Sequence, residues 1–207
     1  MEIILENAGK KFSTEWILRR VDLRLTTGNG YAFVGANGSG KSTLIKLIMG
    51  QLPVNEGLIT YRRDAALIHV DDWHRYLVMA APYLELIEEF TLLEFVAFQS
   101  RFKPFKGALS VEEFIDFAQL SHAAGKLIRH FSSGMKQRLK LAVAFQTDVP
   151  LVFLDEPTSN LDHNGIRWYQ ENVLRLMDTG QLVVVGSNQP EEYTFCKSLV
   201  KMADYKR

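Results

Sequence analysis

The sequence contains very little cysteine, with a single residue, Cys196, in a chain of 207. One cysteine leaves no partner for a disulfide bond within the chain, which excludes the disulfide-stabilised class of small secreted domains. The first residues, MEIILENAG, also carry acids where a secretory signal needs bases. A reducing cytosol is therefore the compartment that the sequence favours.

An excess of charge of either sign is also missing. The 24 basic and 24 acidic side chains cancel. Dedicated nucleic-acid binders usually carry a basic excess, so we expect no nucleic-acid partner. Long apolar runs are absent as well, because none approaches the roughly 18 residues of a membrane-spanning helix. If the protein acts at a membrane, another chain must supply the spanning segments.

Glycine is concentrated in one segment, GANGSGKST at residues 35–43. The segment matches the pattern G-x-x-x-x-G-K-[ST], in which backbone N–H groups converge on phosphate oxygens at a helix N-terminus. An apolar run at 31–34 predicts a buried strand before it, and apolar residues at helical spacing up to Gly50 predict a helix after it. Lys41 is expected on the β- and γ-phosphates, and the Ser42 hydroxyl on a magnesium ion. We therefore expect ATP and Mg²⁺ at the loop residues Gly35, Asn37, Gly38, Ser39, Gly40, Lys41, Ser42 and Thr43.

A second segment, VPLVFLDEP at 149–157, is an apolar run that ends in two acids. Such a run is typical of a central parallel strand whose C-terminal end opens onto a ligand crevice. Asp155 can hold magnesium, and Glu156 can orient or deprotonate an attacking water molecule. A solvated strand end is the ordinary alternative for a pair of acids. The phosphate loop in the same chain favours the catalytic interpretation.

The periodicity of apolar residues changes along the chain. Short apolar runs predict strands at 3–5, 21–25, 31–34, 58–61 and 66–70. The pattern is then helical, and Thr91 with Glu94 and Ser110 with Glu113 fit the capping-box spacing. From residue 134 onward we expect helix, strand, helix and strand at 135–146, 151–154, 166–177 and 182–185, an alternation that implies parallel strands.

These elements define the expected fold class. We predict an α/β fold with a phosphate-loop NTPase core, a mostly parallel sheet, an N-terminal antiparallel β portion and an inserted helical subdomain at about 84–132. The length and the 47% of hydrophobic residues fit a single domain over residues 1–207 with a sizeable core.

A third segment, FSSGMKQR at 131–138, makes the combination more specific. It resembles the family signature LSGGQ followed by QR, with Phe131, Ser133 and Met135 as departures. Together with the phosphate loop and the acidic strand, it resembles the nucleotide-binding subunit of ATP-binding cassette (ABC) transporters. The resemblance covers essentially the whole chain.

The resemblance implies roles for further residues. Ser132 and Gly134 would bind the γ-phosphate held by an opposite subunit, and Asp162 ends the loop 159–162 that matches the family's SxLD and links two active sites. Phe12 fits the aromatic residue that stacks on adenine. Trp16 is a rival for that role, and both rings could equally be packing residues.

Two positions depart from the family pattern. Pro82 stands where the family has a glutamine that touches magnesium and senses the membrane partner. Asn188 stands in the place of the switch histidine, and an amide can donate a hydrogen bond to phosphate without carrying histidine's positive charge. We therefore expect ATP hydrolysis to persist through Glu156, with Lys41 and Asn188 on the phosphates, but to be slower than in typical relatives.

Three functional hypotheses follow. The leading one is an ATPase subunit that dimerises with a second ABC subunit on binding ATP and drives a separate integral membrane permease, peripheral on the cytoplasmic face of the cell membrane. Export is the expected direction, because the sequence carries no cue for a binding protein. The alternatives are a low-turnover regulatory subunit of a heterodimer and a soluble non-transport ABC ATPase. The substrate cannot be read from this chain.

Overall fold

The fold was determined as a computed structural model, which describes residues 1–205. The chain divides into two compact units, each described by itself. The first unit comprises Met1–Met79, Val149–Glu156 and Leu174–Arg207, and the second comprises Ala80–Asp148 and Pro157–Val173. The segment 84–132 that the sequence pattern marks as helical lies within the second unit.

An antiparallel sheet forms the N-terminal part of the first unit. Its strand order is β2-β1-β4-β5, with bounds Glu15–Thr26, Glu2–Phe12, Glu56–Arg63 and Ala66–Ile68. The predicted strand at 66–70 is shorter than expected, because the chain turns into the 3-10 helix η1 (Val70–Tyr76). The ring of Trp73 in η1 stacks on Tyr61 of β4 at a centroid distance of 4.1 Å, which anchors this turn against the sheet.

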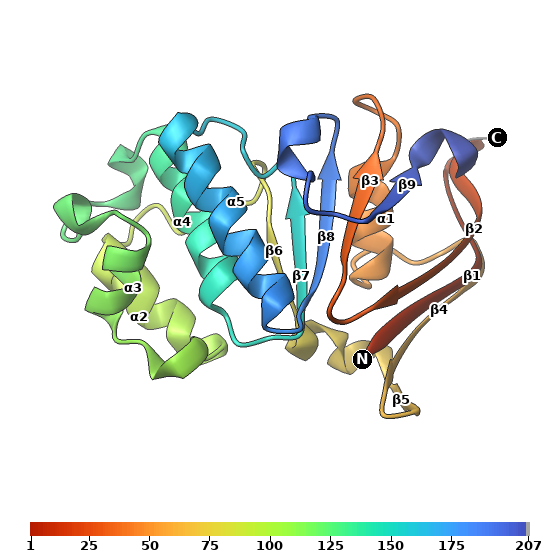
Figure 1. The fold of residues 1–207 in the computed structure, drawn as a ribbon, viewed down its shortest axis with the longest axis horizontal. Coiled ribbons are helices and arrows are strands. Elements are labelled where there is room, and N and C mark those ends of the chain that lie inside the picture. The colour runs from red at the N-terminus through yellow and green to blue at the C-terminus, as the bar shows by residue number, and fades with distance from the viewer. Residues whose placement is uncertain (206–207) are drawn as a thin grey trace. The chain divides into compact units, whose positions relative to one another are not determined.

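A second sheet has the order β6-β7-β8-β3-β9 (Figure 1). Its strands are β6 (Leu77–Ala80), β7 (Leu151–Asp155), β8 (Leu182–Ser187), β3 (Gly30–Val34) and β9 (Ser198–Lys201). The pairs β7–β8, β8–β3 and β3–β9 are all parallel, as predicted. Strands β7 and β8 are buried along their whole length, which explains why they appear in the sequence as unbroken apolar runs.

The core of the first unit lies between its two sheets and helix α1 (Lys41–Ile48). It combines apolar side chains of β1 and β2, such as Ile3 and Val21, with Phe153 of β7 and Val184 of β8. Helix α1 packs against β7 and β8, and the turn that follows it contains Gly50, whose φ of 74° is readily adopted by glycine. The phosphate-loop helix is therefore fixed against these two parallel strands.

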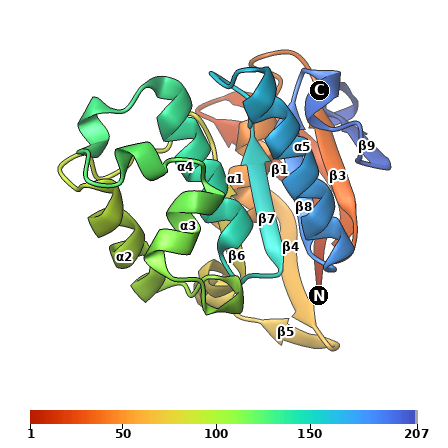
Figure 2. The same cartoon turned by 60° about the vertical axis from the view of Figure 1, so that its left-hand side comes forward.

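The second unit is mainly helical (Figure 2). It contains α2 (Leu92–Phe102), α3 (Val111–Phe117), α4 (Ser133–Gln146) and the first part of α5 (His163–Asp178). Both predicted capping boxes are present: Thr91 Oγ1 accepts from the N–H of Glu94, and Ser110 Oγ from the N–H of Glu113. Aromatic rings fill much of this unit, with Phe105 stacked on Phe114 at 4.5 Å.

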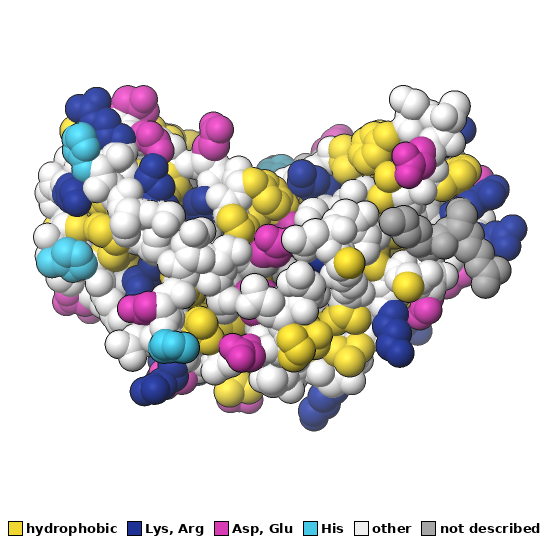
Figure 3. All heavy atoms as spheres, turned by 90° about the horizontal axis from the view of Figure 1, so that it is seen from above, with side chains coloured by type: hydrophobic (Ala, Val, Ile, Leu, Met, Phe, Trp, Pro, Cys, Tyr) yellow, Lys and Arg dark blue, Asp and Glu magenta, His cyan; other side chains and the backbone are white. Residues whose placement is uncertain are grey.

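Charged side chains of both signs are spread over the face seen in Figure 3. Several form ion pairs across the antiparallel sheet, for example Arg24 with Glu2 at 2.7 Å and Arg19 with Glu56 at 3.1 Å. Among residues 1–205, no helix is both long and apolar enough to cross a membrane.

Candidate nucleotide site and signature surface

The phosphate loop runs from β3 into α1 within the first unit. Lys41, the first residue of α1, is 96% buried, with 4% of its surface exposed. Its Nζ donates to the carbonyl oxygens of Gly35 and Ala36, at 2.8 and 3.2 Å. The ammonium group is therefore held inside the curve of the loop, where a phosphate would lie against it.

Two glycines of the loop are required by geometry. A Cβ atom at Gly35 would lie 2.7 Å from Ser39 Oγ, which is closer than real contacts allow. Gly40, at the N-cap of α1, has a φ of 101° and no side-chain cap. The first turn of α1 therefore keeps its N–H end available for an anion, as the sequence pattern predicts.

The two acids lie at the C-terminal end of β7, in the same unit. Asp155 is 1% exposed, and its Oδ1 would lie 2.7 Å from a Cβ atom at Gly186 of β8. Glu156 has a φ of 45°, and its N–H donates to the carbonyl of Gly186 at 2.8 Å. This left-handed backbone turns Glu156 away from the extended path of β7, so that the two carboxylates take different directions.

The residues predicted to bind magnesium supply only oxygen ligands. The Ser42 hydroxyl lies in the first turn of α1, and the Asp155 carboxylate ends a strand against which α1 packs. Hydroxyl and carboxylate oxygens suit Mg²⁺, which keeps several water molecules and takes one or two protein ligands. The chemistry of this donor set fits the ion.

Asn188 follows β8 and reaches the phosphate loop. Its Nδ2 donates to Oδ1 of Asn37 at 3.3 Å. The two amides belong to segments 151 residues apart in the sequence. The structure thus places the residue in the histidine position beside the loop expected to hold the phosphates.

The two candidate adenine-stacking rings lie at the turn between β1 and β2. Trp16 has the Arg19 guanidinium 4.7 Å and the Lys11 ammonium 5.5 Å from its ring centre, and it packs over Gly9. Phe12 is 48% exposed and has Lys10 Nζ at 5.3 Å. The Trp16 ring is already engaged by two cations, so Phe12 offers the more accessible face.

The remaining predicted residues lie in the second unit. Ser132 is the N-cap of α4, where its Oγ accepts from the N–H of Met135 at 3.2 Å. A Cβ atom at Gly134 would lie 2.8 Å from the carbonyl oxygen of Asn160, so the signature segment and the loop 159–162 touch. Asp162 accepts from the N–H of Gly165 at 2.7 Å and thereby caps α5.

These segments line one pocket of about 530 Å³, which we call the signature surface. It is lined by Gln119, Leu120, His122, Ser132, Ser133, Gly134, Met135, Arg138, Asn160, Leu161, Asp162 and Asn164. The predicted site residues therefore fall into two groups, one in each unit.

Sequence reasoning missed two residues that hold this surface together. Gln137 is 2% exposed, and its Nε2 donates to the carbonyl of Pro157 at 2.7 Å. Arg138 bonds to Gln119 and lies near Asp162. Burial lowers the pKa of the Arg138 guanidinium, and Asp162 opposes that effect. The Gln-Arg pair after the signature segment marked these two positions in the sequence, but the pattern did not indicate their contacts.

Comparisons with known proteins identify the family of the chain. A family model described as "ABC transporter" matches residues 18–159. The Nod factor export ATP-binding protein I of Sinorhizobium fredii is 28% identical over 92% of this chain and 56% of its own length. The sulfate/thiosulfate import ATP-binding protein of Rhodopseudomonas palustris is 32% identical over 78% of this chain and 48% of its own length. The chain thus spans about half the length of these two relatives.

A solved structure is similar over nearly the whole fold. It is an ATP-binding cassette described as a dimer in a post-hydrolysis state with ADP and phosphate, with a TM-score of 0.82 and 24% identity. The match covers 96% of this chain and 93% of that one. The family model, the relatives and the shared fold together establish that this chain belongs to the ABC transporter family, as a nucleotide-binding subunit.

Proposed function

We propose that this chain binds and hydrolyses ATP to drive a separate membrane permease. The observation that carries the proposal is the grouping in one unit of the buried Lys41, the oxygen donors Ser42 and Asp155, and Glu156. Export and import proteins both occur among the relatives, so membership of the family is compatible with either direction. We propose export, with the chain peripheral on the cytoplasmic face of the membrane.

The loop residues have defined tasks in this reaction. Lys41 and the N-terminal N–H groups of α1 would neutralise and orient the β- and γ-phosphates. A magnesium ion held by Ser42 and Asp155 would supply further positive charge against the phosphate oxygens. Glu156 would orient a water molecule and accept its proton as the water oxygen bonds to the γ-phosphorus and the bond to ADP breaks. Phe12 would stack on the adenine ring.

The signature surface would complete the site of a second ABC subunit. Ser132 caps α4, so this helix presents N–H groups at its start, where an anion is stabilised. We propose that this end binds the γ-phosphate held by the phosphate loop of the opposite subunit, with Asp162 and its loop beside it. ATP would then join two subunits, and hydrolysis would release them.

The two departures from the family pattern support slow turnover. Asn188 donates to Asn37 at 3.3 Å and carries no charge that could stabilise the transferred phosphoryl group. Pro82 has no side-chain ligand, and its carbonyl oxygen accepts from Lys140 Nζ at 2.6 Å. These observations also favour the second candidate, a regulatory subunit with little turnover of its own.

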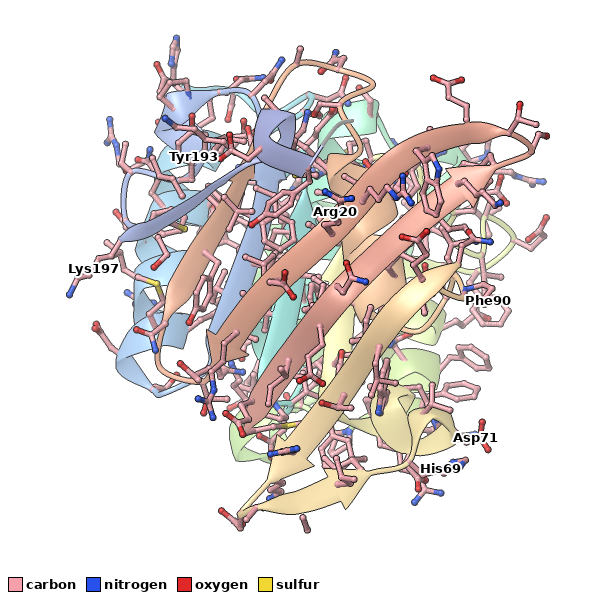
Figure 4. The ribbon with its side chains drawn as sticks, turned by 90° about the vertical axis from the view of Figure 1, so that its right-hand side faces the viewer. Arg20, His69, Asp71, Phe90, Tyr193 and Lys197 are labelled. Carbon is pink, nitrogen blue, oxygen red and sulfur yellow. The ribbon has the colours of Figure 1, made fainter. Side chains whose placement is uncertain are left out.

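A surface of aromatic rings supports docking of the membrane partner. Phe90, which precedes α2, and Phe98 and Phe102 of α2 form an aromatic ladder, with successive ring centres 5.4 and 4.6 Å apart. Phe102 is 68% exposed, and Figure 4 shows Phe90 beside neighbouring rings. We propose that this aromatic ladder receives a helical segment of the permease. Phe102→Ser should reduce copurification of the permease while leaving ATP binding by the isolated chain intact.

The test of the proposed function is Glu156→Gln. Wild type should release phosphate from ATP, and the variant should lose this turnover by on the order of a hundredfold or more. The variant should also form an ATP-dependent dimer that sedimentation velocity detects, because ATP binds but is not cleaved. Unchanged turnover without a trapped dimer would remove Glu156 from the catalytic role. Turnover near the detection limit in wild type, with ATP binding intact, would instead favour the regulatory candidate.

A further inference from the structure

Arg138 lies where four segments of the second unit meet. Its side chain extends from α4 and is only 13% exposed. Nη1 donates to Gln119 Oε1 at 2.7 Å, just after α3 ends. Nη2 lies 3.9 Å from Asp162 Oδ1, and the guanidinium sits 5.0 Å from the ring centre of Trp168 on α5. One planar group thus contacts the turn after α3, helix α5 and the loop that carries Asp162.

The surroundings of Arg138 allow little freedom. Gly165 has no room for a Cβ atom without contacts of 3.1 Å to both Arg138 Nη2 and Asp162 Oδ1. Asp162 Oδ1 also accepts from the N–H of Gly165, so the carboxylate is fixed from two sides. Gln119 has a left-handed φ of 58°, a conformation that costs free energy unless contacts hold it. The bond to Arg138 is such a contact.

We infer that Arg138 is a positioning residue that holds the N-terminus of α4 and the Asp162 loop in one fixed arrangement on the signature surface. This inference rests on the proposed function, in which that surface binds the nucleotide of a second ABC subunit. Two backbone contacts already join the start of α4 to the segment 157–162. Gly134 lies against the carbonyl of Asn160, and Gln137 donates to the carbonyl of Pro157. Arg138 adds a side-chain connection between α4 and the residues Asp162 and Gln119, both of which line the pocket.

The contacts of Arg138 require a planar guanidinium with several N–H donors. A guanidinium can donate to Gln119 and face Asp162 at once while one flat face rests on Trp168. Lysine keeps the charge and the contact with the ring but offers a single ammonium point. Arg138→Lys should therefore fail to replace arginine, although it preserves net charge.

The experiment measures ATP-driven dimerisation in the Glu156→Gln background. Sedimentation velocity with MgATP gives the protein concentration at half dimerisation, and calorimetry gives ATP binding by the monomer. Arg138→Lys and Arg138→Gln should raise the half-dimerisation concentration about tenfold or more, a change of about 1.4 kcal/mol. ATP binding should stay unchanged, because the phosphate loop belongs to the first unit. Arg167→Gln, which removes an exposed arginine from α5, is the matched control and should leave both quantities unchanged.

A second pair of variants tests the same contact without touching Arg138. Gln119→Leu removes the acceptor and should weaken dimerisation, whereas Gln119→Glu keeps an acceptor for Arg138 and should weaken it less. If the Arg138 variants do not fold, this pair decides the inference. A merely structural role would lower the thermal unfolding midpoint of the variants but leave dimerisation of the folded protein unchanged.

The outcomes separate the two proposals. A Glu156→Gln protein that dimerises with ATP, while its Arg138 and Gln119→Leu derivatives dimerise equally well, overturns the positioning role alone. A Glu156→Gln protein that binds ATP without ever dimerising overturns the proposed pairing of subunits and this inference together. The positioning role is supported if Arg138→Lys and Gln119→Leu lose dimerisation, Gln119→Glu loses less than Gln119→Leu, and Arg167→Gln dimerises as the parent does.

Discussion

Glu156 combines an unfavourable backbone conformation with a compensating contact. A left-handed φ of 45° costs a non-glycine residue roughly 1–2 kcal/mol. The hydrogen bond from its N–H to the carbonyl of Gly186 ties this turn to β8 and offsets part of that cost. Because Asp155 stays in the extended strand and is 1% exposed, the two neighbouring acids occupy different environments. Two neighbouring carboxylates need different environments if one is to bind the metal ion and the other is to act as the base.

Asn188→His should raise the turnover number several-fold. Histidine can carry a positive charge near neutral pH and place it beside the transferred phosphoryl group, which the amide cannot do. Steady-state phosphate release at saturating ATP measures the effect. An unchanged turnover number, together with a wild-type rate already matching typical relatives, would show that Asn188 does not limit the reaction.

Cys196 should react slowly with thiol reagents in the folded protein. Burial raises the pKa of its thiol to about 12, so very little thiolate is present at pH 8. Alkylation by iodoacetamide at pH 8 should be about a thousandfold slower in the native protein than in denaturant. Equal rates in the two states would mean that the thiol is exposed in the folded chain.

Among the secondary-structure elements, the N-termini of α3 and α4 are capped alike but differ in whether they can accept an anion. Ser110 caps α3 and Ser132 caps α4 in the same way, each with its hydroxyl accepting from the N–H three residues on. Ser110 forms a closed capping box with Glu113, which occupies the helix end. Ser132 is followed by Met135 at that position, so no carboxylate competes with an incoming phosphate. The same local motif thus stabilises one helix and leaves the other open to an anion.

Ser132→Ala and Ser110→Ala form a matched pair. Each should lower the free energy of unfolding by about 1 kcal/mol through loss of an N-cap, which denaturant titration measures. Only Ser132→Ala should also weaken ATP-dependent dimerisation in the Glu156→Gln background. Equal dimerisation by the two variants would argue that the start of α4 does not bind the neighbouring nucleotide.

Elements whose start or end depends on neighbouring residues could be predicted from the sequence. Elements that depend on contacts with residues far away in the chain could not. Thr91 and Ser110 are followed three residues later by a glutamate, and this spacing alone located two helix starts correctly. Strand β9 was missed because its four residues gain their partner only when they pair with β3, far away in the sequence. The predicted strand at 66–70 was too long for a similar reason, since Trp73 anchors η1 through Tyr61. Arg138 was missed because its partners come from separate helices and a loop.

At the scale of the whole molecule, the proposed chemistry is divided between the two units. The candidate nucleotide and magnesium residues belong to the first unit, and the signature residues Ser132, Gly134 and Asp162 to the second. In the proposed dimer, the first unit would bind ATP and the second unit would contact the ATP held by the other subunit. ATP binding at the phosphate loop should therefore be independent of substitutions in the second unit, whereas dimerisation should depend on both.

Every other proposed step depends on ATP binding at the phosphate loop through Lys41, and titration calorimetry of MgATP into the isolated chain measures this binding. We predict saturable binding of one ATP per chain for wild type, and loss of that binding in Lys41→Ala. Leu67→Ala, at an exposed position on β5, serves as the control and should bind as wild type does. Absence of any binding heat for wild type at millimolar MgATP would mean that the phosphate loop does not hold ATP.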